Sequence, residues 1–82
     1  MMELKDTVDM MLSDDYKERF KAEYWQLKIR HDKLKKMVDN WDKLDFRPTC
    51  PYSTYMHQLR AMEDYMALLR DRAEREKVEL DD

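Results

Sequence analysis

The stretch FKAEYWQLKIRHDKLKKMVDNW, residues 20–41, decides the fold of this chain. Its apolar and aromatic residues recur at alternating steps of four and three, the a/d pattern of a helix that packs along another helix. The pattern predicts one long helix with a continuous contact face. This first seam consists of Phe20, Tyr24, Leu27, His31, Leu34, Val38 and Trp41.

The same rhythm returns after both prolines of the chain, in residues 52–73. At 1.5 Å per residue each seam spans about 31 Å, so the two helices match in length. We therefore expect a coiled-coil-like antiparallel hairpin in which facing residue numbers add up to about 93. The second seam consists of Tyr52, Tyr55, Leu59, Met62, Met66, Leu69 and Ala73. The expected facing pairs are Trp41 with Tyr52, Leu34 with Leu59, His31 with Met62 and Phe20 with Ala73.

The connection RPTCPYS, residues 47–53, separates the seams and holds the only cysteine. Pro51 suits the first turn of a helix, where its missing N–H costs nothing, with Thr49 or Cys50 as the cap. A cysteine close to a helix N-terminus can have a lowered pKa and react. No catalytic constellation accompanies Cys50, so we interpret the stretch as a hinge. His31, a lone polar residue in a seam, is more typical of a register-fixing residue than of a metal ligand.

The sequence before residue 16 predicts a short first helix and a restart. Val8, Met11 and Leu12 form a small apolar cluster, and Ser13, Asp14 and Asp15 are residues suited to capping a new helix. We expect a single helical domain over residues 1–82. Its parts are a helix at about 5–12, a helix at about 14–43, a proline-containing loop at 44–51, a helix at about 52–77 and an acidic tail, ELDD.

Composition agrees with an all-α fold. Glycine is absent and 43% of the residues are charged, as in long helices rather than sheets. A chain of 82 residues buries little surface, so oligomerisation or a partner would add needed stability. The net charge of −3 disfavours general nucleic-acid binding.

Several function classes lack their sequence signals. No apolar run approaches the roughly 18 residues of a membrane span, and the first residues do not read as a signal peptide, so we expect a cytoplasmic protein. One cysteine makes no internal disulfide. No nucleophile–base pair, phosphate loop or metal motif is visible, so we expect neither an enzyme nor a cofactor.

Two apolar strips lie behind the seams, where a two-helix hairpin leaves them uncovered. Ala22, Trp25 and Ile29 form the strip of the earlier helix, and Ala61, Tyr65 and Leu68 form that of the later one. The first helix, through Val8, Met11 and Leu12, is expected to fold over one strip. The other would stay open as an interface, because a contiguous exposed apolar patch usually marks one. Candidate interface residues, for a homo-oligomer or a foreign partner, are Trp25, Ile29, Tyr65 and Leu68.

A basic stretch lies in the middle of the earlier helix. Arg30, Lys33 and Lys36 are its candidate contacts for an anion or a partner, with Lys28 and Lys35 close by. The alternative is that these side chains are only a solubilising charged face.

Residues 16–76 resemble a family of small proteins from phages and prophages of gut bacteria, usually described as related to a crAss-like phage product. The matching segments are LKIRHDKLKKMVDNW, LDFRPTCP and YSTYMHQLRAMEDYMALLRDRAE. The most distinctive pattern, QLxAMxxYxxxL, comprises Gln58, Leu59, Ala61, Met62, Tyr65 and Leu69. The resemblance carries no catalytic or ligand residues over to this chain.

What the resemblance implies is a phage context, in which small non-enzymatic proteins often act by binding. The leading hypothesis is a counter-defence inhibitor, similar to an anti-CRISPR, that covers a functional surface of a host defence protein such as a CRISPR nuclease. One alternative is a sponge for nucleotide second messengers, in which aromatic stacking combines with Arg and Lys. Another is a structural helical oligomerisation module.

Overall fold

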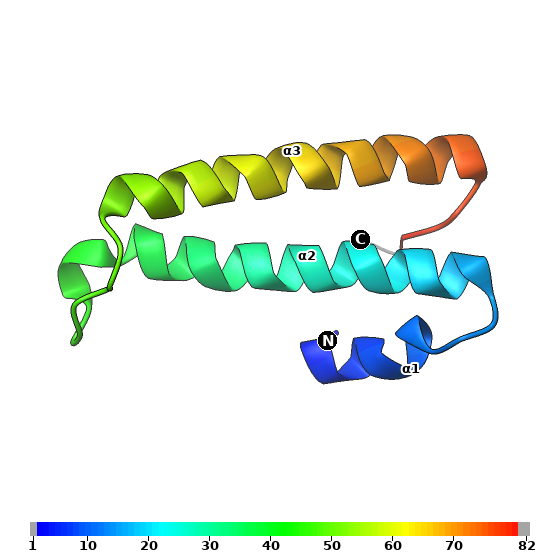
Figure 1. Cartoon of the computed structure of the whole chain (residues 1–82), viewed down its shortest axis with the longest axis horizontal. Helices are drawn as coiled ribbons and strands as arrows, with labels where there is room; N and C mark the ends of the chain where they lie inside the picture. Colours follow the sequence, from blue (N-terminus) through cyan, green and yellow to red (C-terminus); the bar gives the residue numbers. More distant parts are fainter. Residues whose placement is uncertain (1, 81–82) are drawn as a thin grey trace.

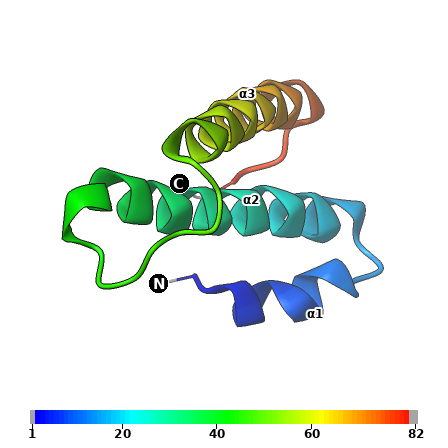
Figure 2. The ribbon, with the colours of Figure 1, turned by 60° about the vertical axis from the view of Figure 1, so that its left-hand side comes forward.

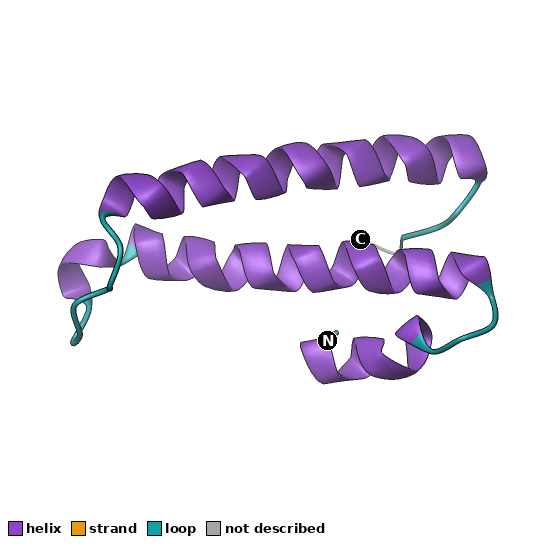
Figure 3. Ribbon diagram, in the orientation of Figure 1, coloured by secondary structure: helices purple, strands orange, loops and turns teal. Residues whose placement is uncertain are grey.

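The computed structural model describes residues 2–80. Met1 and residues 81–82, which belong to the predicted domain and to its acidic tail, lie outside the described residues. The described residues contain helices and connections and no strand (Figure 3). The all-α prediction is therefore confirmed. In chain order the elements are η1 (Leu4–Thr7), α1 (Val8–Met11), α2 (Tyr16–Asp39), η2 (Trp41–Lys43) and α3 (Tyr52–Glu76).

The long helices α2 and α3 lie side by side and run in opposite directions (Figure 1). At one end the rings of Trp41 and Tyr52 are 5.3 Å apart. At the other end the Tyr16 hydroxyl donates to Glu76 at 2.7 Å. The residue numbers in each pair add up to within one of the predicted sum of about 93. The hairpin prediction is confirmed.

The core lies between the two seams. Four first-seam residues are buried and three are half-buried, whereas Tyr52, at the start of the second seam, stays exposed. Burial of apolar surface is the main stabilising contribution of such a packed face. The continuous buried cluster consists of Phe20, Tyr24, Met66, Leu69, Ala73, Val78 and Leu80.

Helix α2 begins as the sequence predicts and ends earlier. Asp15 is the N-cap, and its carboxylate accepts from the backbone N–H of Lys17 at 3.0 Å. The helix stops at Asp39 rather than at 43, because Asn40 leaves the helical region and its side-chain amide donates to the carbonyl of Lys36. Trp41 therefore sits on a separate 3-10 turn.

The start of α3 corrects the predicted cap. Neither Thr49 nor Cys50 caps the helix, because Pro51 itself occupies the N-cap position in an extended conformation. The Cys50 N–H points instead to the Tyr55 hydroxyl, 3.4 Å away. The thiol of Cys50 is free and half-buried.

The first helix is split into η1 and α1, and the surface it packs on α2 differs from the prediction. Thr7 is fully buried, and its hydroxyl donates to the carbonyl of Leu4 and accepts from Gln26 of α2. Val8, Met11 and Leu12 stay largely exposed, and of these three the Met11 sulfur accepts from the side-chain amide of Gln26 in α2. Thr7 of η1 is the residue of this segment that is fully buried.

The residues after α3 turn back onto the hairpin (Figure 1). Lys77 adopts the left-handed conformation (φ 58°), and the N–H of Val78 bonds to the carbonyl of Ala73, which ends the helix. Val78 and Leu80 then enter the core. We call residues 77–80 the C-terminal strap.

Candidate functional site

A cavity of about 610 Å³ lies between α2 and the first residues of the chain. Trp25 and Ile29, expected to be an open interface, form its apolar wall. The N-terminal segment partly covers these two residues, and their assignment as interface residues stays a prediction. The Trp25 cavity is lined by Met2, Glu3, Trp25, Lys28, Ile29, Asp32 and Lys33.

Trp25 is the largest side chain of the cavity and is held on two sides. Its Nε1 donates to the backbone carbonyl of Leu80 at 2.8 Å. Its ring meets that of Tyr24 edge to face, with centroids 5.9 Å apart. The indole thus packs against the core and also lines the cavity.

Charges of both signs surround the Trp25 cavity. Lys28 forms an ion pair with Asp32 at 3.5 Å, one turn along α2. Glu3, at the opposite wall, lies 3.5 Å from Lys5. No ion pair between residues of the described range involves Lys33. Lys33 is therefore the cavity charge most available to an anion.

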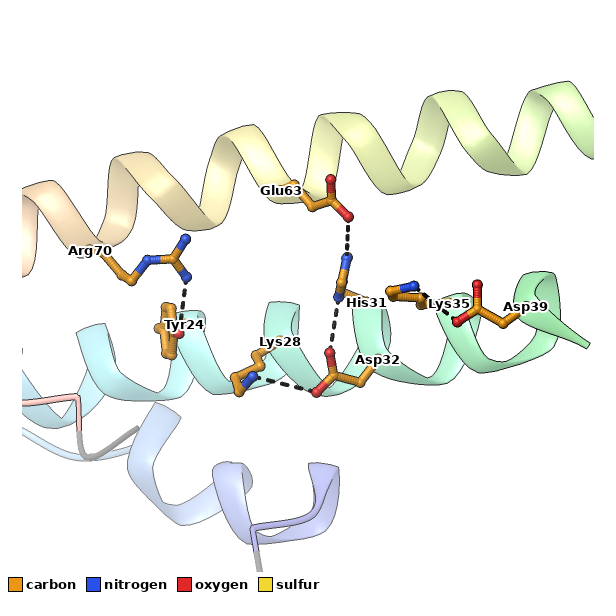
Figure 4. A network of polar contacts seen from close by, with 8 residues as sticks. All are labelled: Tyr24, Lys28, His31, Asp32, Lys35, Asp39, Glu63 and Arg70. Atoms are coloured by element: carbon orange, nitrogen blue, oxygen red, sulfur yellow. Dashed lines mark hydrogen bonds and ion pairs between the residues drawn. The ribbon is translucent and has the colours of Figure 1, made fainter.

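A polar network next to the cavity joins the two long helices (Figure 4). His31 Nε2 lies 2.8 Å from Glu63 Oε2 of α3, and Nδ1 lies 3.0 Å from Asp32 Oδ1. The partner of His31 across the hairpin is thus Glu63, the neighbour of the expected Met62. A few turns away, Arg70 donates to the Tyr24 hydroxyl at 3.3 Å. These contacts hold Tyr24 and His31 of α2 in place, and the residues that follow them in sequence, Trp25 and Asp32, line the cavity.

The candidate residues are divided between several places. Trp25, Ile29 and Lys33 meet in the Trp25 cavity, whereas Arg30 is exposed and Lys36 lies outside the lining. On α3, Tyr65 is 44% exposed and Leu68 is 63% exposed, so this strip stays open as expected.

A second polar cluster lies at the hairpin end opposite the proline loop. The Tyr65 hydroxyl donates to Glu23, and this hydrogen bond raises the pKa of Tyr65. The Tyr16 hydroxyl likewise donates to Glu76, which raises the pKa of Tyr16 and lowers that of the Glu76 carboxyl. Arg72 lies over the Phe20 ring at 4.9 Å and donates to Tyr16. This side of the hairpin therefore combines paired charges with exposed aromatic and leucine side chains.

Sequence reasoning missed the residues that come from the chain ends. Met2 and Glu3 carry no motif, and their approach to α2 depends on the η1 turn. Leu80 left a weak signal: Val78 and Leu80 alternate with acidic residues after the helix, as in an extended segment with one buried face.

No helix in residues 2–80 has the length and apolar content to cross a membrane. The same part of the chain contains no cluster of three or more His, Cys, Asp or Glu side chains arranged to hold a metal ion.

Comparison with known families gives one match. The family model named Sequestin matches residues 14–75, which covers α2, the proline loop and nearly all of α3. Comparisons with curated proteins and with solved structures gave no match. The matched region includes Trp25, Lys28, Ile29 and Lys33 of the cavity.

Proposed function

We propose that this chain, which belongs to the Sequestin family, is a non-enzymatic sequestering protein that binds a nucleotide second messenger in the Trp25 cavity. The name of the family describes the withholding of a target, and a protein that acts in this way needs a binding site rather than a catalytic one. The observation that carries the proposal is the placement of an indole and an available lysine in one cavity.

The size of the cavity supports a small-molecule ligand. Sites for small molecules are concave, mostly apolar, and about 300–1,000 Å³ in volume, with a few polar groups that orient the ligand. The Trp25 cavity has about 610 Å³, with Trp25 and Ile29 as apolar walls and two lysines and two acidic residues also in its lining.

The chemistry of the lining supports a ligand with an aromatic ring and a negative charge. A nucleobase can stack on the Trp25 indole, as bases stack on aromatic side chains in other proteins. A phosphate can pair with Lys33, and a lysine ammonium binds phosphate as a point charge. A cyclic nucleotide carries both groups at a short separation.

The biological setting of the proposal rests on the resemblance of residues 16–76 to phage and prophage proteins. In that setting the protein acts in the cytoplasm of the host bacterial cell. It lowers the free concentration of a signal that a host defence system produces, and it does so by stoichiometric binding.

A thermal-shift panel of cyclic di- and trinucleotides tests this function. A ligand at a hundredfold excess over its Kd adds about 2.7 kcal/mol to the stability of a folded protein. For a domain of this size that corresponds to a rise in Tm of more than about 10 °C. The ligand should be recovered unchanged after the protein is denatured. No shift with any member of the panel would overturn the nucleotide proposal, and a chemically altered ligand would overturn the non-enzymatic one.

A second candidate function is a counter-defence inhibitor that acts by protein–protein contact, as an anti-CRISPR protein does. The exposed strip of Tyr65 and Leu68 on α3 favours it, because exposed apolar patches mark interfaces. A pull-down from host lysate with wild type and with Leu68→Glu tests this candidate. A host defence protein retained by the wild type and lost with Leu68→Glu is the expected result, and equal capture by both would contradict it.

A further inference from the structure

The C-terminal strap, residues 77–80, is held in place by a turn at its start and by two buried side chains. The left-handed Lys77 and the bond from the N–H of Val78 to the carbonyl of Ala73 redirect the chain after α3. The side chains of Val78 and Leu80 are then buried in the core cluster. A segment held by a turn and by two buried side chains has a defined position rather than a choice of several.

Trp25 connects the strap to the cavity. The Leu80 carbonyl accepts from Trp25 Nε1 at 2.8 Å, and Trp25 forms the aromatic wall of the Trp25 cavity. The sequence separates these two residues by 55 positions, so the contact depends on the folded strap. An indole N–H that is partly withdrawn from water needs an acceptor, and the strap supplies it.

We propose that the C-terminal strap positions the Trp25 indole for ligand binding, so that docking of the strap and occupation of the cavity are coupled. Leu80 is in this view a positioning residue, which acts through Trp25 and does not touch the ligand. This inference rests on the proposed function, because it assigns the strap a role at the same site.

The coupling has a direct thermodynamic consequence. We assume that a ligand binds tightly only when the strap is docked and the indole is fixed. The apparent affinity is then the affinity of the docked form multiplied by the fraction of molecules in which the strap is docked. By reciprocity, ligand binding must strengthen strap docking by the same factor. The strap thus sets how much of the protein is competent to bind.

Fluorescence of Trp25 tests the first half of the proposal without any ligand. In a Trp41→Phe background, Trp25 is the only tryptophan of the chain. Leu80→Asp should undock the strap and shift the emission to longer wavelength, as the indole loses its partner and meets water. Leu80→Ala is a milder variant in case Leu80→Asp unfolds the chain, as circular dichroism would show. Glu79→Ala, on the exposed side of the strap, should leave the emission unchanged. Unchanged emission in folded Leu80→Asp and Leu80→Ala proteins would overturn the proposal.

Calorimetric titration of the same variants with the cyclic nucleotide that gives the largest thermal shift tests the second half. Leu80→Ala should weaken binding by about tenfold, because the truncated side chain docks the strap less well and fewer molecules then hold the indole in its bound position. Glu79→Ala should bind as the wild type does. A shifted emission with unchanged affinity would show that the strap holds Trp25 but does not tune the site, and would overturn the coupling. If the wild type binds no nucleotide, the proposed function and the coupling both fall, and the emission alone decides whether the strap positions Trp25.

Discussion

His31 of α2 and Glu63 of α3 meet across the hairpin, with Nε2 and Oε2 2.8 Å apart. His31 is only 7% exposed, and its other ring nitrogen lies 3.0 Å from an Asp32 oxygen. Both nitrogens of this buried imidazole are therefore partnered, as buried polar groups generally are. The pair satisfies a polar residue in an otherwise mostly apolar seam and marks one register of the two helices.

A double-mutant cycle on His31 and Glu63 should show that the two side chains are coupled in their effect on stability. His31→Leu and Glu63→Ala should each destabilise the protein, and the double variant should lose less than the sum of the two. We expect a coupling energy of about 0.5–1.5 kcal/mol, the net worth of a typical hydrogen bond. Urea unfolding of the four proteins measures it. Asp64→Ala, next along the helix, is the control that should not couple with His31, and equal values for both cycles would contradict the pairing.

The packed centre of the hairpin gives a second prediction. Leu59 is buried, and Leu59→Ala should lower the free energy of unfolding by about 2–5 kcal/mol, because it removes buried methyl groups and leaves a cavity. Leu12→Ala, the same change at a leucine that is exposed and lies outside the strip on α3, should stay within about 0.5 kcal/mol of the wild type. A loss below half a kcal/mol for Leu59→Ala would mean that the seam is assigned incorrectly.

Acid should remove the contribution of Glu76. The hydrogen bond from Tyr16, together with Arg72, holds the pKa of the Glu76 carboxyl below its ordinary value. The stability that this carboxylate contributes is therefore present above the ordinary glutamate pKa and is lost as the pH falls through the lowered value. The stability difference between wild type and Glu76→Gln should shrink between about pH 7 and about pH 3, as urea unfolding can follow. Glu74→Gln is the control, and an equal pH dependence for both variants would contradict this assignment.

Lys33 should matter more for ligand binding than Lys36. Lys33 lines the Trp25 cavity, whereas Lys36 lies one turn beyond it on the same helix. Lys33→Gln should weaken binding of a cyclic nucleotide by about tenfold, the loss expected for one charge-assisted contact. Lys36→Gln should change it little. Similar losses for both variants in calorimetric titrations would indicate a diffuse electrostatic attraction instead of a site.

The open strip on α3 leads to a prediction about assembly. Tyr65 and Leu68 lie three residues apart on one exposed face, and a second copy of the chain can cover them in a closed symmetric dimer. We expect a dimer or larger assembly by light scattering, and Leu68→Glu should dissociate it while helical content persists. Leu12→Glu, directly after α1, is the control for an added charge at an exposed leucine. A wild-type mass of 10.2 kDa, that of one chain, would refute the assembly.

The architecture was predictable because its signals are periodic and local. The seams of α2 and α3 and their register follow from spacing, and a shift of register would expose the apolar positions. For the start of α2 the residue types offered Ser13, Asp14 and Asp15 as caps, and Asp15 is the one that the structure uses. The ends of the helices were less predictable. Asn40 ends α2, and its side-chain amide donates to the backbone carbonyl of Lys36. The sequence contains no glycine, the residue that most often marks the end of a helix.

The site was only partly predictable because it depends on segments without periodicity. The sequence identified Trp25 and Ile29 as parts of an apolar strip and Lys33 as part of a basic stretch. It did not place the three residues in one cavity. The walls that enclose the cavity come from Glu3 and its neighbour, and the support of the indole comes from Leu80. Such contacts bring together opposite ends of the chain, and no local pattern encodes them.

The approach of both chain ends to Trp25 has a practical consequence for labelling this protein. An affinity tag or fluorescent protein attached next to Met2 or next to Leu80 would crowd the indole. The proline loop joins α2 and α3 at one end of the hairpin (Figure 2). Its residues Phe46 and Arg47 are exposed. Exposed loops accept insertions far better than packed termini. A short epitope inserted between Phe46 and Arg47 is thus the attachment point that leaves both ends of the chain undisturbed.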